Sequence, residues 1–325
     1  MVFIHPIPYK KGRDNWITRN LGLILKNKSE IKSVSMERII LKLREEPFWL
    51  MFFSISAVLI ALIAVKSFAG LLGNFEMDYE MFFWFLLVGF VAQTIDGALG
   101  MAYGVSSNSI LLGIGIPPAV ASAWVHFAQV FTSLASGFSH WKLGNVKWDL
   151  AKKLMIPGVL GAVIGAYFLS NIDGNTIKPF IAIYLFIMGL IILGKVIRKK
   201  KKVFNPNAKS LPYLASIGGF ADAIGGGGWG PIVNSTLMGK GQVPRFAIGT
   251  GNFVEIFVSL ASATTFLFFI KDLSLAPILG LILGGVIAAP FAAIICKKLN
   301  PKLLMIFVGV LIIFLSIRTF YLTLD

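Results

Sequence analysis

The chain has 325 residues, of which 56% are hydrophobic and only 14% are charged, and its formal net charge is +15. A water-soluble core of this size does not need so large an apolar share, so the composition indicates an all-α polytopic membrane protein. The single cysteine, Cys296, excludes an intrachain disulfide and a cysteine-cluster metal site, and the three histidines are too scattered for a zinc site. We therefore expect no metal and no cofactor.

The first 46 residues form a basic arm that holds ten Lys and Arg residues and no long apolar run. Such an arm is typical of an interfacial helix on the anionic lipids of the cytoplasmic leaflet, with a disordered tail as the alternative. Residues 47–70 follow as an extra transmembrane helix. The basic run at 198–202 follows a membrane span, so it favours a headgroup-facing loop over a nucleic-acid partner.

Apolar segments that can cross the bilayer recur along the whole chain, and we expect about seven full crossings. The clearest segments are Phe48–Ala69, Pro118–Phe138, Lys153–Ser170, Pro179–Leu193, Pro244–Ile270, Leu275–Cys296 and Leu303–Phe320.

Most of the 30 Lys and Arg residues lie in the arm and in the segments 139–153, 195–210, 239–245 and 297–302. Basic loops face the cytoplasm, so all five groups should lie on that side of the cell membrane, with the N-terminus cytoplasmic and the C-terminus outside. This pattern requires 81–116 and 211–239 to be re-entrant hairpins that enter and leave on one side.

The two halves of the chain resemble each other. "QVFTSLAS" (129–136) matches "EIFVSLAS" (255–262), and "GALG" (97–100) aligns with "GGWG" (227–230) at an offset four residues larger. We define a first membrane repeat (81–196), a basic cytoplasmic loop (197–210) and a second membrane repeat (211–322). The first copy starts outside and the second inside, which predicts an inverted repeat. Chance similarity between apolar helices is the alternative.

Glycine clusters mark a break in each predicted hairpin, because non-helical backbone at membrane depth survives only against protein or water. Each break would present the N-terminus of a short helix, near residues 105 and 231, as an anion site. Close helix packing is the alternative reading of these glycines. The candidate substrate-binding residues at the breaks are Gly97, Gly100, Gly104, Ser106, Ser107, Asn108, Gly226, Gly227, Gly228, Trp229, Gly230, Asn234 and Ser235.

Polar side chains also recur with helical spacing in the segment that follows each hairpin. These stripes consist of His126, Gln129, Ser133 and Ser136 in the first half and of Asn252, Glu255, Ser259 and Ser262 in the second. They predict two polar faces on a shared cavity, with His126, Gln129 and Asn252 as substrate ligands, although polar groups can also simply join helices.

Ionisable groups at membrane depth are functional candidates, because burying a charge there is costly. Glu255 is the strongest candidate for proton coupling, since its mate in the first stripe is the neutral Gln129. Asp96 and Asp222 each precede a glycine break, so they either carry protons or cap the interrupted backbone. His126 titrates in a suitable range, but a neutral, hydrogen-bonded histidine fits equally well.

The paired glycine-rich hairpins and the following polar helices resemble the sulfite exporter TauE/SafE family, also called the 4-toluene sulfonate uptake permease family, over about residues 81–320. The resemblance implies a secondary transporter of a small sulfur-containing anion such as sulfite or an organosulfonate, and we expect export. An anion channel and a proton-coupled uptake permease for another organic anion remain alternatives. No common enzyme motif is present, so we expect no enzyme.

Overall fold

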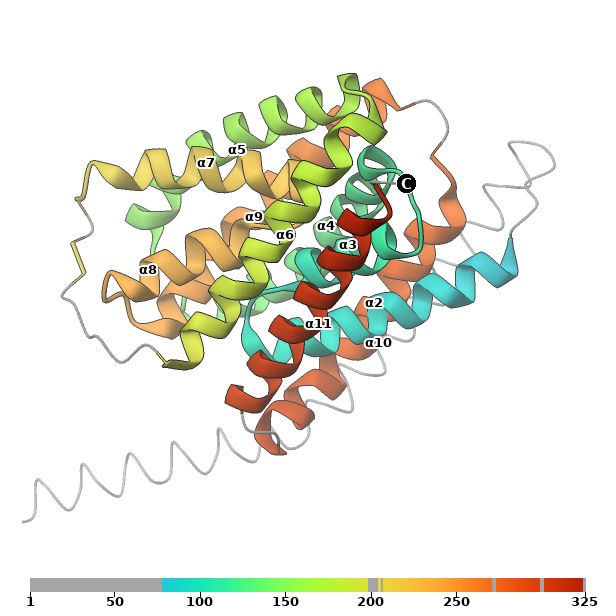
Figure 1. Cartoon of the computed structure of the whole chain (residues 1–325). Helices are drawn as coiled ribbons and strands as arrows, with labels where there is room; N and C mark the ends of the chain where they lie inside the picture. Colours follow the sequence, from blue (N-terminus) through green and yellow to red (C-terminus); the bar gives the residue numbers. More distant parts are fainter. Residues whose placement is uncertain (1–77, 198–203, 206, 271–272, 299–300, 324–325) are drawn as a thin grey trace, which may run out of the picture. The chain divides into compact units, whose positions relative to one another are not determined.

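The computed structural model describes residues 78–197, 204–205, 207–270, 273–298 and 301–323, and all regular structure in this part is helical (Figure 1). The predicted arm at 1–46, the extra transmembrane helix at 47–70 and half of the basic loop at 197–210 lie outside the described residues.

The described elements fall into two series of similar lengths on either side of that loop. The first series is α2 (Tyr79–Leu99), α3 (Tyr103–Gly113), α4 (Pro118–Lys142), α5 (Trp148–Asn171) and α6 (Gly174–Ile197). The second is α7 (Ser210–Gly225), the π-helix η1 (Trp229–Asn234), α8 (Ser235–Gly239), α9 (Pro244–Phe269), α10 (Leu275–Lys298) and α11 (Pro301–Tyr321).

Local sequence sets several of these helix ends. Pro118 and Pro244 begin α4 and α9, where a missing N–H costs nothing and the fixed φ suits the first turn. Gly100 and Gly226 end α2 and α7 in the left-handed conformation, with φ of 67° and 64°, which glycine adopts without a Cβ clash. The chain is thus interrupted at both places where the glycines predicted a break.

Five of the described helices are long and apolar enough to cross a membrane. Their apolar windows are Tyr79–Asp96, Trp148–Asn171, Gly174–Lys195, Pro244–Phe269 and Lys302–Tyr321. Large apolar side chains such as Phe83, Leu160, Phe180 and Phe314 point outward, as expected for helices that face lipid. The segment 79–96 was expected only as one arm of a hairpin. The predicted spans 118–138 and 275–296 are absent from the five, although α4 has 25 residues and α10 contains a shorter apolar segment, Leu275–Ala288.

Helix pairs from the two series pack closely through glycines. α2 and α10 run parallel, because Gly280 lies against the Phe82 carbonyl and Gly284 against the Leu86 carbonyl. α5 and α7 are related in the same way: Gly161 and Gly165 of α5 lie against the carbonyls of Ser216 and Phe220 of α7. Advancing four residues on one helix advances four on the other in both pairs, so each pair is parallel.

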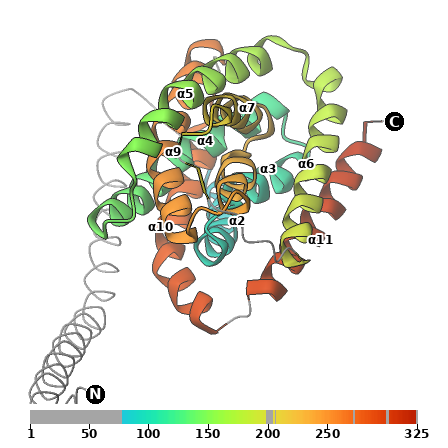
Figure 2. The ribbon, with the colours of Figure 1, turned by 90° about the vertical axis from the view of Figure 1, so that its left-hand side faces the viewer.

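Two further pairs are antiparallel. Ser136, near the end of α4, bonds to Asn252 near the start of α9, whereas the rings of His126 and Phe266 meet further along, with centroids 5.9 Å apart. α6 and α11 also run in opposite directions, since Gly189 lies beside Ile313 and Leu193 beside Gly309. Figure 2 shows α3 and α7 between α5, α9 and α10 on one side and α6 and α11 on the other.

Candidate functional site

The two interruptions share one hydrogen-bond pattern. Asp96 Oδ1 accepts the Tyr103 N–H at 3.2 Å across the first break, and Asp222 Oδ1 accepts the Trp229 N–H at 2.9 Å across the second. Both bonds span seven residues, and both follow from a buried helix N-terminus that needs an acceptor. Each aspartate thus accepts a backbone N–H at a helix start, which is the geometry that the capping role requires.

The shared pattern corrects the sequence alignment of the breaks. The capping aspartates and the left-handed glycines Gly100 and Gly226 correspond at a constant offset of 126 residues, the same offset as between Gln129 and Glu255. Aligning "GALG" (97–100) with "GGWG" (227–230) is therefore wrong, because abundant glycine produced a local match out of register. Gly97 lies in the last turn of α2, so the first break begins only at Gly100.

The breaks meet backbone to backbone at Gly104 and Gly227. A Cβ on Gly227 would overlap the backbone of Gly104 and the Val105 nitrogen, and a Cβ on Gly104 would overlap the Gly226 carbonyl oxygen and lie 2.7 Å from the Gly227 Cα. Glycine is required at both positions because no side chain fits between the two backbone segments. The N-terminal turns of α3 and η1 are thereby brought together in the protein interior.

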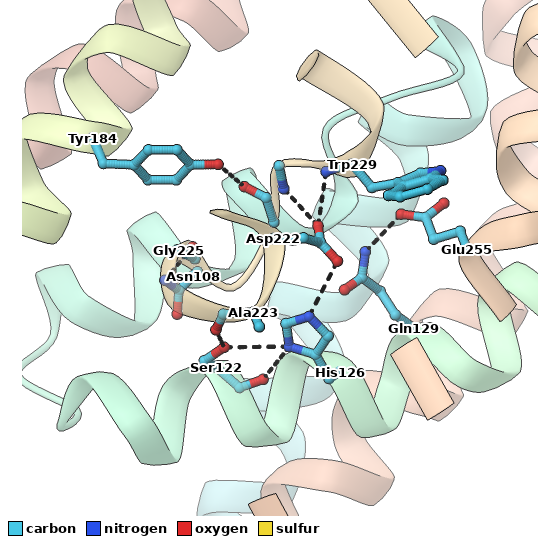
Figure 3. A network of polar contacts seen from close by, with 12 residues as sticks. Asn108, Ser122, His126, Gln129, Tyr184, Asp222, Ala223, Gly225, Trp229 and Glu255 are labelled. Carbon is cyan, nitrogen blue, oxygen red and sulfur yellow. Dashed lines mark hydrogen bonds and ion pairs between the residues drawn. The ribbon is translucent and has the colours of Figure 1, made fainter. Parts of the chain in front are cut away.

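Side chains from other helices hold the second break (Figure 3). The Asp222 carboxylate also accepts the Gly228 N–H at 2.6 Å and lies 3.2 Å from His126 Nε2 of α4. The Tyr184 hydroxyl of α6 donates to the Gly227 carbonyl at 3.0 Å, and the Asn108 amide of α3 donates to the Gly225 carbonyl at 2.6 Å. The Asp222 and His126 side chains are both completely buried.

A small cavity lies where the breaks and the two polar stripes converge. It is lined by Asp96, Gly100, Met101, Ala102, Tyr103, Gly104, Val105, Gln129, Thr132, Ser133, Ser136, Asp222, Gly227, Gly228, Gly230, Pro231, Asn234, Asn252 and Glu255. Residues from both halves of the chain thus surround one space.

The stripes supply the wall of this cavity opposite the breaks. Gln129 Nε2 of α4 donates to Glu255 Oε1 of α9 at 3.1 Å, so residues at equivalent positions of the two stripes meet directly. The Asn252 amide donates to Ser136 Oγ at 2.8 Å. The side-chain oxygens of Gln129 and Asn234 are buried and have no hydrogen-bond partner within the described residues. The site therefore offers unsatisfied polar groups to a ligand.

Several predicted ligands lie outside this lining. Ser106, Ser107, Asn108, Trp229 and Ser235 belong to the helix starts near the cavity, Gly226 is the residue at which α7 ends, and His126 lies behind the cavity. Trp229 fills the interior, because its ring packs on Gly158 and its Nε1 donates to the Gly251 carbonyl at 3.0 Å. His126 contacts Asp222 rather than the cavity, which a stripe on one helix could not reveal. Ser259 and Ser262 are buried outside the lining as well.

Other site residues were not singled out from the sequence. Thr132 and Tyr103 line the cavity, and Tyr184 bonds to the second break from α6. Thr132 lies three residues after Gln129 on α4, a helical spacing that could have indicated it. Tyr103 and Tyr184 had no signal, since tyrosine is common in apolar helices and their partners are distant in sequence.

An all-helical bundle with several membrane-length helices and a buried polar cavity defines a membrane transport protein, and comparisons with known proteins agree. The profile of the family described as "Sulfite exporter TauE/SafE" matches residues 85–319. The chain therefore belongs to the sulfite exporter TauE/SafE family.

Three relatives are similar to the chain to different extents. The probable membrane transporter protein YtnM of Bacillus subtilis (strain 168) is 43% identical over 72% of this chain and 81% of its own length. YdhB of the same organism, also a probable membrane transporter protein, is 26% identical over 58% of this chain and 70% of its own. The "Sulfite exporter TauE/SafE family protein 6" of Arabidopsis thaliana is 24% identical over 53% of this chain and 39% of its own length. No solved structure matches the chain.

Proposed function

We propose that this protein is a secondary transporter that exports a small sulfur-containing anion, such as sulfite or an organosulfonate, through the cavity between the two breaks. The observation that carries the proposal is the meeting of the N-terminal turns of α3 and η1, at Gly104 and Gly227, beside a buried polar cavity. The family and the name of the Arabidopsis relative support a sulfur oxyanion as the substrate.

The helix starts provide the groups that would bind this anion. Asp96 and Asp222 occupy the N–H groups of Tyr103, Gly228 and Trp229. The following first-turn amides, which belong to cavity-lining residues such as Gly104 and Gly230, have no carbonyl partner within their helix. Amide N–H groups at the positive end of a helix favour a bound oxyanion. Ser133, Ser136 and Asn252 add hydroxyl and amide donors from the stripes.

Alternating access between two inverted repeats is the mechanism we propose for this site. The offset of 126 residues relates the breaks and the stripes, and the parallel pair α2 and α10 is matched by the pair α7 and α5. The equivalent helices α4 and α9 are antiparallel, as inverted copies require. Figure 1 supports hairpins that enter from opposite sides, since the α2–α3 hairpin leads to the start of α4 and the α7–η1–α8 hairpin to the opposite side, where α9 starts.

The distribution of basic residues between the two sides of the bundle supports transport from the cytoplasm to the outside. The α4–α5 and α8–α9 connections, whose sequences include Lys147 and Lys240, lie on one side of the bundle, and the α5–α6 connection, whose sequence includes Asp173, lies on the other (Figure 1). With a negative cell interior, each negative charge moved outward gains about 2.3 kcal/mol per 100 mV. Voltage therefore favours export of a sulfite dianion without another energy source.

Flux of labelled sulfite in proteoliposomes under an imposed voltage tests the proposal. We expect saturable efflux that accelerates with inside-negative voltage, and counterflow driven by unlabelled sulfite on the opposite side. Flux without saturation or counterflow would instead identify an anion channel. Absence of sulfite and organosulfonate flux at every voltage would contradict the proposed function.

A further inference from the structure

The charges around the cavity do not match an anionic ligand. Within the described residues, the lining includes three carboxyl groups, those of Asp96, Asp222 and Glu255, and no Lys, Arg or His. Lys195 of α6 is not part of the lining, although its Nζ lies 2.8 Å from the sulfur of the lining residue Met101. Like charges repel strongly in a medium of low dielectric constant, so an oxyanion cannot enter readily while all three carboxyl groups are charged.

Two of the three carboxylates, those of Asp96 and Asp222, lie at the N-termini of α3 and η1, whose positive ends favour a negative charge. Asp222 accepts two backbone N–H groups and contacts His126, and Asp96 accepts the Tyr103 N–H. Glu255 differs, because it lies in the middle of α9, away from any helix N-terminus, and its hydrogen-bond partner is the neutral Gln129 amide. Its charge is therefore the one that protonation would most readily remove.

We propose that Glu255 takes up one proton when the cavity binds its anion, so that anion and proton move together. This inference rests on the proposed function and adds its coupling ion. A carried proton leaves a sulfite dianion with one net negative charge, so voltage still favours export, with half the charge moved.

Gln129 is suited to hold Glu255 in both protonation states. Its amide nitrogen donates to the Glu255 carboxylate at 3.1 Å, while its oxygen is buried without a partner and the residue is 3% exposed. If the Gln129 amide flips, its oxygen accepts a hydrogen bond from the protonated Glu255 carboxyl group. An amide thus serves the acid and the base equally, which a second carboxylate or a lysine at position 129 would not.

The other titratable groups around Glu255 are already engaged or lie at helix ends. On α4, His126 contacts Asp222; on α3, the Tyr103 hydroxyl donates to the Leu281 carbonyl; on α6, Tyr184 donates to Gly227. The charged residues of the packed helix α5 are Asp149, Lys152 and Lys153, all near its start, and Arg245 lies in the first turn of α9. Within the described part of the chain, Glu255 is thus the acid of the cavity lining that lies away from a helix N-terminus, which predicts one proton per anion.

Binding of methanesulfonate to the purified full chain, measured by calorimetry from about pH 5 to about pH 8, tests the inference. This probe keeps a single negative charge throughout the range, so it contributes no titration of its own. We expect the Kd to rise about tenfold per pH unit once Glu255 loses its proton, because one proton is linked to binding. In the pH range where the Kd rises, repeating the titration in buffers of different ionisation enthalpy should give an uptake of one proton per anion.

Glu255→Gln mimics the protonated side chain and should bind methanesulfonate with an affinity that no longer changes with pH. Asp149→Asn is the matched control, since it makes the same chemical change at an exposed position and should keep the wild-type slope. Should Glu255→Gln fail to fold, the proton uptake of the wild-type chain still decides.

The outcomes separate the two proposals. Binding without proton uptake, or a pH slope that persists in folded Glu255→Gln, overturns the coupling role and leaves the transport function standing. Absence of binding of methanesulfonate and of sulfite at every pH overturns the proposed function and the coupling role with it.

Discussion

The two breaks perform the same task with different support. The first, around Gly100, is held by Asp96, which lies in the same helix, and the chain there passes through Ala102 at a φ of 105°. The second, around Gly226, is held by Asp222 and by side chains of α3, α4 and α6. The comparison teaches that the glycine-rich copy is the anchored one, because its bare backbone lets neighbouring helices bond to it directly.

The largest effect is expected where the breaks touch. Gly227→Ala would place a Cβ inside the backbone of Gly104 and Val105, which cannot yield as a flexible side chain could. We expect the free energy of unfolding in detergent to fall by about 3 kcal/mol and sulfite flux to be lost. Gly239→Ala is the control, because nothing lies within 4 Å of its Cβ position. Equal stability of the two variants would refute the close contact between the breaks.

The next largest effect is expected at the capping aspartates, whose removal should destabilise the protein to different extents at the two breaks. Asp222→Ala leaves His126 and two buried backbone N–H groups without the carboxylate that they contact, so we expect the free energy of unfolding to fall by about 3 to 5 kcal/mol. Asp96→Ala removes a single cap and should cost about 1 kcal/mol. Chemical unfolding of both variants measures the difference, and a larger loss for Asp96→Ala would reverse the assignment of the anchored break.

We expect substitutions of His126 and of its counterpart Asn252 to have different effects, on stability at His126 and on sulfite binding at Asn252. His126 contacts Asp222 behind the cavity, so His126→Gln should lower the unfolding free energy by about 1 to 3 kcal/mol. Because the cavity is not changed, the Kd for sulfite should stay within about twofold of the wild-type value. A loss of sulfite affinity with unchanged stability would make His126 a ligand, as the stripe on α4 first predicted.

The smallest effect is expected at Ala102, in the first break. A left-handed φ strains a residue with a Cβ, so Ala102→Gly should raise the unfolding free energy by less than about 1 kcal/mol, after the entropy that glycine loses on folding. The reverse change at the corresponding position, Gly228→Ala, should destabilise, because its Cβ would overlap the Tyr184 hydroxyl. Thermal unfolding of Ala102→Gly and of Gly228→Ala measures whether each change stabilises or destabilises the protein. A stabilising Gly228→Ala would contradict the description of the second break.

The sequence predicted the features that arise from local chemistry. Glycine clusters indicated both breaks, and helical spacing indicated that Gln129 and Glu255 belong to related polar faces. Long-range pairing was not predictable in the same way: no pattern on α4 indicates that His126 meets Asp222, 96 residues away. The register of the breaks was misjudged, because four consecutive glycines match almost any glycine-rich segment. The polar stripe of α4 also lowers its hydropathy, which explains its absence from the five membrane-length windows.

Binding of labelled sulfite to the purified protein and to Asn252→Leu tests most directly whether the cavity between the breaks is the transport site. Asn252 lines the cavity beside Ser136, whereas Ser262, on the same helix, is buried outside the lining, so Ser262→Ala is the control. We predict that Asn252→Leu weakens sulfite binding by at least about tenfold and that Ser262→Ala leaves it unchanged. Undiminished sulfite binding by folded Asn252→Leu would contradict the account.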